Sequence, residues 1–167
     1  MSASPIRQFP DPVLKAPTRV VARVDDGIRD VVDGLIRTMR HHPRCVGLAA
    51  PQVGHALRIA VMDSSVHPKA GHSHGLLVLI NPRIGAQEGR VVQREGCLSI
   101  PDFTANVERA QRVRLEAHDR FGSAYELWLT GFEAIIAQHE IDHLDGKLFL
   151  DRVANLKTDV FRRKTYL

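Results

Sequence analysis

The segment GFEAIIAQHEIDHL at residues 131–144 constrains the fold of this chain more than any other feature. Its apolar residues and its two histidines recur at helical spacing and form one stripe, made of Phe132, Ile135, Ile136, His139 and His143. A helix of this length is marginal in water by itself and depends on packing of its apolar face. We therefore expect a central helix with the rest of the chain packed around it.

The other apolar patterns predict a second helix and a run of strands. Strands are predicted at 58–62, 76–80, 90–93, 106–118 and 125–129, with a turn at 81–82 and a hairpin turn at 119–123. An amphipathic helix is predicted at 25–42, a loop or short strand at 47–54, and short helices at 11–15 and from Asp151. Because the strands follow one another without intervening helices, the pattern favours an α+β fold, with antiparallel or mixed β-sheets around the central helix.

Length and composition limit the number of domains and the class of protein. A chain of 167 residues, with 44% apolar and 25% charged residues, suits a single globular domain spanning 1–167. Such a chain can fold without a disulfide or a structural metal, so a metal bound to it would serve function. The start MSASPIRQFP lacks an apolar signal region, and only two cysteines are present, which predicts a cytoplasmic protein.

Charge and hydropathy argue against two classes of partner. The net charge of +4 is spread along the chain, and the densest basic stretch, 162–164, is predicted to be a solvated tail. We therefore expect no direct recognition of nucleic acid. No apolar run approaches the roughly 18 residues that cross a bilayer, so we expect no membrane contact.

His139, Glu140 and His143 form the pattern H-E-x-x-H within the predicted central helix. Histidines four residues apart project from one helical face and can bind one tetrahedral metal ion, while the glutamate can reach the metal's water. The alternative is a pair of ordinary core histidines, because this short pattern also occurs by chance. The helical context favours the metal site, with Gln138 and Asp142 as outer partners of the ligands.

A hydrolytic metal site needs a third protein ligand. No histidine follows His143 in the rest of the chain, which leaves Asp151 and Asp159 as late carboxylate candidates. Upstream, Cys97 is another candidate, because Gly96 allows close approach of the backbone and a thiol ionises on binding a divalent metal. A lone cysteine is otherwise more often a small buried apolar residue. The residue pattern alone leaves these alternatives open.

Three motifs in order resemble those of the peptide deformylases: GLAAPQ at 47–52, EGCLS at 95–99 and QHEIDHLDG at 138–146. FPDPVLK, LINPRI and LFLDR extend the resemblance over almost the whole chain. It implies an enzyme, a metal-dependent hydrolase that removes the formyl group from the N-terminal formyl-methionine of newly made polypeptides and releases formate. The implied partners are nascent formyl-methionyl polypeptides, with transient contact to the ribosome.

The same resemblance assigns roles within the site. One divalent metal ion would be held by Cys97, His139 and His143. Iron(II) is the ion implied in the cell, with zinc, nickel or cobalt as alternatives in the isolated protein. Glu140 would be the general base. The side-chain amide of Gln52 and the backbone N–H of Leu98 would stabilise the negative charge on the formyl oxygen.

Substrate contacts are implied in the same way. The methionine side chain would enter an apolar pocket lined by Val46, Phe132, Ile135 and Ile136, although ordinary core packing is the alternative role for these residues. Gly47 would offer its backbone to the peptide. Cys45 departs from the family, which commonly has glycine there. If that glycine supplies a positive φ, the cysteine costs about 1 kcal/mol or more and puts substrate affinity in question.

Two further groups of side chains have predicted roles outside catalysis. His67, His72 and His74 lie among Pro and Gly residues, which predicts a mobile exposed loop and not a second metal site. Glu95 and Arg109 are predicted to pair and brace the EGCLS segment.

Three other functions remain as alternatives. They are a zinc peptidase, a non-catalytic metal-binding or ribosome-associated protein on the same fold, and a deformylase-like enzyme with an altered substrate. The missing downstream ligand argues against the peptidase. A purely structural metal site takes four protein ligands and needs no general base, so Gln52 and Glu140 favour catalysis.

Overall fold

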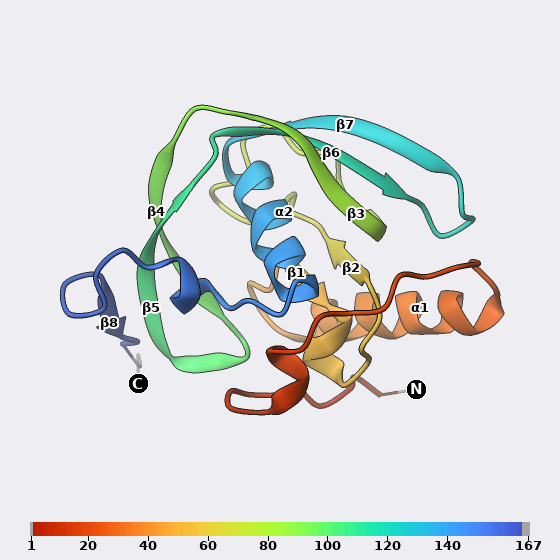
Figure 1. Cartoon of the computed structure of the whole chain (residues 1–167), viewed down its shortest axis with the longest axis horizontal. Helices are drawn as coiled ribbons and strands as arrows, with labels where there is room; N and C mark the ends of the chain where they lie inside the picture. The colour runs from red at the N-terminus through yellow and green to blue at the C-terminus, as the bar shows by residue number, and fades with distance from the viewer. Residues whose placement is uncertain (1, 165–167) are drawn as a thin grey trace.

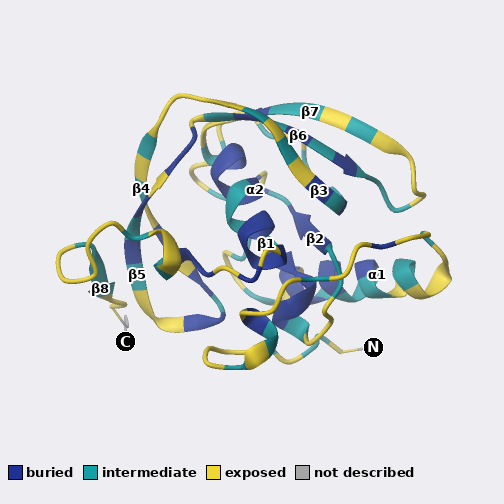
Figure 2. Cartoon of the chain, viewed as in Figure 1, coloured by how far each residue is buried: buried dark blue, intermediate teal, exposed yellow. Residues whose placement is uncertain are grey.

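The central helix of the computed structural model, which describes residues 2–164, is α2 (Gly131–Leu144). Two sheets and the second long helix, α1 (Asp26–His41), surround it (Figure 1). Most residues of α2 are buried, including both polar and apolar ones (Figure 2). The predicted α+β fold with a central helix is confirmed. Asp25 caps α1, because its side chain accepts a hydrogen bond from the backbone N–H of Ile28.

The strands form two antiparallel sheets. The larger sheet has the order β1-β2-β3-β6-β7, with β1 (Gly47–Ala49), β2 (Ile59–Met62), β3 (Leu77–Glu88), β6 (Arg112–His118) and β7 (Ala124–Thr130). The smaller sheet has the order β4-β5-β8, with β4 (Val91–Cys97), β5 (Ile100–Arg109) and β8 (Val160–Arg162). Short 3₁₀ helices lie at Pro12–Leu14, Ala50–Val53 and Phe149–Arg152.

The position of β2 explains why its sequence is apolar throughout. Ala60 and Met62 belong to the core cluster that contains the apolar side chains of α2. Ile59 and Val61 belong to the cluster that contains those of α1. Both faces of the strand are therefore covered, and all four residues are fully buried. The two helices thus lie on opposite faces of the larger sheet, with α2 between this sheet and the smaller one (Figure 1).

The turn predicted at 81–82 is wrong, because β3 continues through it to Glu88. Asn81 has a φ of 52°, and the register between β3 and β6 shifts there, so the residues form a bulge. The Asn81 side chain accepts from the backbone N–H of Val21 and donates to its carbonyl, which fixes the bulge against the N-terminal segment.

The single strand predicted at 106–118 is also wrong. It is divided between β5 and β6, which belong to different sheets. Ala110, at the division, bonds through both its backbone N–H and its carbonyl to the side chain of Gln138 on α2, each at 2.9 Å. The helix therefore takes the place of a strand partner at this point.

The short helix predicted to begin at Asp151 is wrong as well. Asp151 lies inside the 3₁₀ turn Phe149–Arg152, and the chain then leads to β8. Residues 162–164 are exposed, as predicted for a tail, but Arg162 is part of β8. None of the helices in residues 2–164 combines the length and the apolar composition needed to cross a bilayer.

Candidate metal centre

Three side chains that can bind a metal ion meet where the end of β4 contacts α2. Cys97 closes β4, and His139 and His143 lie on successive turns of α2. One donor atom from each residue lies within 4.8 Å of the other two. The sulfur of Cys97 is 3.3 Å from Nε2 of His143. The structure thus brings together the cysteine and the two histidines that the sequence placed 42 or more residues apart.

The orientation of His139 is fixed by Glu95. Nδ1 of His139 lies 2.8 Å from Oε1 of Glu95. Burial raises the pKa of Glu95, but hydrogen bonds from Arg109 and His139 outweigh it and lower this pKa to about 2. The ionised carboxylate only accepts, so Nδ1 donates and the lone pair of Nε2 is free to bind a metal.

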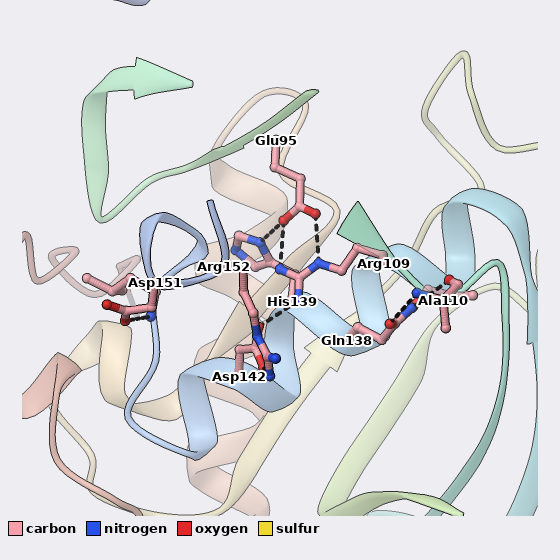
Figure 3. A network of polar contacts seen from close by, with 10 residues as sticks. Glu95, Arg109, Ala110, Gln138, His139, Asp142, Asp151 and Arg152 are labelled. Carbon is pink, nitrogen blue, oxygen red and sulfur yellow. Dashed lines mark hydrogen bonds and ion pairs between the residues drawn. The ribbon is translucent and has the colours of Figure 1, made fainter. Parts of the chain in front are cut away.

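A network of charged side chains, buried except for Arg152, supports this contact (Figure 3). Arg109 donates to the two carboxylate oxygens of Glu95 at 2.8 and 2.9 Å and to Asp142 at 2.6 Å. Arg152 donates to both oxygens of Asp142, at 2.8 and 3.1 Å. The predicted pairing of Glu95 with Arg109 is confirmed, and Asp142 is linked to His139 through Arg109 and Glu95.

We expect an Arg109→Met variant to lose about 3–5 kcal/mol of unfolding free energy, because it leaves two buried carboxylates without their partner. Urea denaturation measures the loss. Arg90→Met removes an exposed arginine that is 3.6 Å from Glu108 and should cost less than about 1 kcal/mol. Equal losses in the two variants would contradict the assigned role of Arg109.

The chemistry of the donor set suits a first-row divalent ion. Burial opposes ionisation of the Cys97 thiol, but the imidazoles of His143 and His139 outweigh it and hold the pKa of Cys97 well below its usual value. One thiolate and two imidazoles are ligands that zinc, iron(II), nickel and cobalt accept. Residues 2–164 thus supply three ligands, which leaves one position of a tetrahedral site for water or substrate.

Glu140 provides an independent test of that fit. Glu140 is 4% exposed, and within the described residues its Oε2 atom is buried without a hydrogen-bond partner. Burial raises the pKa of Glu140, while the charges of His139 and His143 lower it. A buried carboxylate oxygen without a partner is costly. The residues therefore fit a bound ion with a water molecule that Glu140 can reach.

Gln52 lies beside the ligands with both ends of its amide held. Its Oε1 accepts from the backbone N–H of Ala49 at 3.0 Å. Its Nε2 is 3.1 Å from Oγ of Ser99 and 3.4 Å from the sulfur of Cys97. The amide donor is therefore directed at the metal centre. Sequence analysis missed Ser99, which also donates to the backbone carbonyl of Arg7.

A cleft of about 330 Å³ opens onto the centre. Its lining includes all the residues predicted for the substrate and the oxyanion: Val46, Gly47, Gln52, Leu98, Phe132, Ile135 and Ile136. Ile136 also belongs to the core cluster, so core packing and cleft lining coexist in this residue. The lining also includes Arg44, Lys69, Arg94 and Arg163, which sequence analysis did not connect with the site.

Gly47 is needed for a steric reason. A Cβ atom built on it would lie 2.5 Å from Oε1 of Glu140. The Glu140 carboxylate therefore occupies the space that a side chain at position 47 would need.

Cys45 does not carry the predicted strain. In the described residues the positive φ of this segment, 64°, falls on Arg44. The Cys45 thiol donates to the carbonyl of Gly47 at 3.2 Å. Burial, and next the charge of Glu140, raise the pKa of Cys45 to about 12, so this thiol stays protonated.

Several predicted partners of the ligands lie elsewhere. Gln138 bonds the backbone of Ala110 and does not contact the ligands, so its assignment as an outer partner is wrong. Asp151 bonds Lys15 and the backbone N–H of Leu148 instead of approaching the centre. Asp159 is likewise absent from the group of donor atoms found in the described residues.

The predicted mobile loop that contains His67, His72 and His74 is anchored to α2. The backbone N–H and Nδ1 of His74 lie 2.8 and 2.6 Å from the carboxylate of Glu133. The ring of His67 packs on Phe132, with centroids 4.8 Å apart. The sequence contains one sign of this anchoring, the acidic residue Glu133 within an otherwise apolar stretch of helix. In the structure Glu133 is 1% exposed.

Comparisons with known proteins agree on one family. The family profile described as "Polypeptide deformylase" matches residues 3–159. "Peptide deformylase" of Thermodesulfovibrio yellowstonii is 40% identical over 164 residues, which cover 98% of this chain and 97% of that one. "Peptide deformylase 1" of Pseudomonas syringae pv. tomato is 47% identical over 160 residues, 95% of this chain and 92% of the other.

A solved structure shares the fold. The crystal structure of peptide deformylase from Thermotoga maritima superposes with a TM-score of 0.84 at 36% identity, covering 93% of this chain and 100% of that one. Both the sequence and the fold are therefore matched over nearly the full length of the chain. The chain belongs to the peptide deformylase family.

Proposed function

We propose that this chain removes the formyl group from the N-terminal formyl-methionine of newly made polypeptides and releases formate. The observation that carries the proposal is the joint placement of Cys97, His139 and His143 with Glu140 in one cleft, in a chain of this family. A structural metal site would have no use for a buried carboxylate beside three ligands. The same placement therefore favours an enzyme over a metal-binding scaffold.

One divalent ion would be held by Cys97, His139 and His143. When bound, the ion makes an adjacent water acidic enough to ionise near neutral pH and withdraws charge from the substrate carbonyl. We propose iron(II) in the cell, as the family resemblance implies, with zinc, nickel or cobalt in the isolated protein. The thiolate and two imidazoles suit all four ions.

Glu140 moves the proton. Burial raises the pKa of its carboxyl group, which brings it closer to the value at which a general base is efficient at neutral pH. It takes a proton from the attacking water and passes it to the amine nitrogen that leaves when the carbon–nitrogen bond of the formyl group breaks. The products are formate and a free N-terminal methionine.

Gln52 and Leu98 would stabilise the charge that develops on the formyl oxygen. The amide of Gln52 is already oriented by Ala49 and Ser99, so no reorganisation is needed during the reaction. Leu98, next to Cys97, would contribute its backbone N–H.

The apolar lining would select methionine. Val46, Phe132, Ile135 and Ile136 offer a surface for an unbranched apolar side chain, and Gly47 offers its backbone to the peptide. A hydrophobic pocket by itself distinguishes one methyl group by about 1–3 kcal/mol, so exclusion of acetylated chains depends on the narrow space around the formyl carbon.

The cell location follows from the substrate. We place this activity in the bacterial cytoplasm, where nascent formyl-methionyl chains leave the ribosome, with transient contact between the enzyme and the ribosome. The relatives of this chain from Thermodesulfovibrio and Pseudomonas support a bacterial setting.

The test is formate release from formyl-Met-Ala-Ser by protein prepared anaerobically and loaded with iron(II) or nickel. The proposal expects release from this peptide and none from acetyl-Met-Ala-Ser. A protein that carries one metal ion per chain and releases no formate would contradict it.

A Gly47→Ala variant should retain its metal and lose about tenfold or more in kcat, since its Cβ would displace the Glu140 carboxylate. Gly34→Ala is the matched control, because the nearest atom to its Cβ would be Nη2 of Arg37 at 3.8 Å. We expect the control to keep full activity. Formate release and metal content are the measurements, and a fully active Gly47→Ala protein would refute the steric argument.

A further inference from the structure

We propose that this enzyme prefers polypeptides with acidic side chains directly after the formyl-methionine, and that Arg44, Lys69, Arg94 and Arg163 at the cleft provide the preference. The inference rests on the proposed function, because it concerns the part of the same substrate that follows the methionine. It assigns a role to four cations that the reaction itself does not use.

The four cations come from separate parts of the chain. Arg44 precedes β1, Lys69 lies between β2 and β3, Arg94 is on β4 and Arg163 follows β8. All four side chains are exposed and line one cleft. Cations from four segments that converge on one concave surface create a positive potential there, which a scattered surface charge does not.

In the part of the chain that the structure describes, no acidic side chain offsets this charge. Within residues 2–164, none of the four cations forms an ion pair with a carboxylate. The cleft lining contains two acids, Glu95 and Glu140, and both are buried. Glu95 is already paired with Arg109. The accessible part of the lining is therefore cationic and available to an anionic ligand.

Arg163 and Arg94 are held in place. The backbone N–H of Arg163 bonds the carbonyl of Asp102 at 2.8 Å, and its guanidinium lies over Gly96, where a Cβ atom would be 2.2 Å from Nη2. Gly96 thus admits Arg163 beside the ligand Cys97. The guanidinium of Arg94 stacks 3.6 Å from the ring centroid of Phe161.

The geometry of the cleft favours a peptide as the occupant. Lys69 lies 6.0 Å from the ring centroid of Phe132, in the apolar part of the lining, whereas Arg163 lies over Gly96 beside Cys97. A chain whose methionine enters the apolar part therefore has cations within reach of the residues that follow it. Nucleic acid is met by basic residues clustered on one face or along one helix, whereas these cations surround a cleft that also has an apolar part. Acidic side chains at the two positions after methionine are therefore the anions that these cations meet.

The experiment compares kcat/KM for formyl-Met-Glu-Glu, formyl-Met-Gln-Gln and formyl-Met-Lys-Lys. At about 20 mM salt we expect roughly tenfold faster turnover of the acidic peptide than of the neutral one, and slower turnover of the basic one. Near 0.5 M salt the difference should shrink to about twofold, because exposed charges are screened.

Variants assign the effect to the cleft. Arg163→Gln should reduce the ratio of acidic to neutral kcat/KM about threefold, and Arg163→Lys should preserve it. Arg23→Gln makes the same change in net charge at an exposed arginine outside the cleft lining and should leave the ratio unaltered. Because the measured quantity is the ratio of kcat/KM for the acidic and neutral peptides, a variant that loses activity equally on both leaves it unchanged.

The outcomes separate this inference from the proposed function. Turnover of the neutral peptide without any acidic preference, or a preference that Arg163→Gln leaves intact, overturns the inference alone. If the enzyme hydrolyses none of the formyl peptides, the proposed function is overturned. The cleft can then still be tested by calorimetry, which compares the affinities for Met-Glu-Glu and Met-Lys-Lys. Equal affinities would refute the acidic preference. Displacement of Met-Glu-Glu by a short single-stranded RNA would assign the cations to nucleic acid and also refute it.

Discussion

A Glu140→Gln variant should bind its metal normally and lose about 10²- to 10⁴-fold in kcat, the range that general acid–base catalysis contributes. The amide has the size of the carboxylate but cannot take the proton of the attacking water. No other acid in the described lining can replace it, because Glu95 has a pKa of about 2 and is bound to Arg109. Formate release gives the rate, and elemental analysis gives the metal content.

Glu133→Gln is the matched control for that result. Glu133 is also a buried carboxylate on α2, but it bonds His74 and lies outside the group of metal ligands. We expect this variant to keep its rate within about threefold, because an amide can still bond the loop. If Glu140→Gln turned over at the parental rate with full metal, proton transfer would have to be assigned to another group.

The part of the candidate site on α2 was predictable because its pattern is local. His139, Glu140 and His143 lie within one and a half turns of a single helix, so the period of 3.6 residues fixes their relative direction. Cys97 was different. The residue pattern offered three candidates for the third ligand, namely Cys97 and two carboxylates, and only the family resemblance favoured Cys97. The pattern could not decide, because the distance from Cys97 to His143 depends on how β4 packs on α2.

The errors in the predicted strands have the same origin. Asn81 and Pro82 carry a turn signal, but the side chain of Asn81 bonds Val21, and the strand continues as a bulge. Ala110 interrupts a strand pattern because Gln138 of α2 bonds its backbone. In both places a side chain distant in the sequence decides the local structure, and no local pattern contains it.

The cationic lining of the cleft was the feature least predictable from the sequence. Arg163 belongs to a basic stretch that is typical of a solvated tail, and the pairing of β8 with β5 brings it to the cleft. Arg44 and Lys69 have no motif around them. Charges that come from separate segments converge only in the folded chain, so their spacing in the sequence carries no signal.

A Gln52→Leu variant should lose about 10²- to 10³-fold in kcat with little change in KM, because its amide donor acts on charge that develops only in the transition state. Leucine has a similar size and no donor. The backbone N–H of Ala49 also loses its partner, which should cost about 1–3 kcal/mol of unfolding free energy. Rates are therefore measured well below the midpoint of thermal unfolding.

A Ser99→Ala variant separates the role of the Gln52 amide as a hydrogen-bond donor from the role of the residues that hold it in place. It removes one contact of the same amide, at 3.1 Å, but leaves Nε2 free to reach the substrate and Oε1 bonded to Ala49. Its kcat should fall by less than about tenfold, since the amide keeps its bond with Ala49 and its contact with Cys97. If Gln52→Leu and Ser99→Ala lost equal activity, the amide would act by holding the 3₁₀ turn in place. A loss confined to Gln52→Leu assigns the amide to the oxyanion, while Glu140 transfers the proton between the attacking water and the leaving nitrogen.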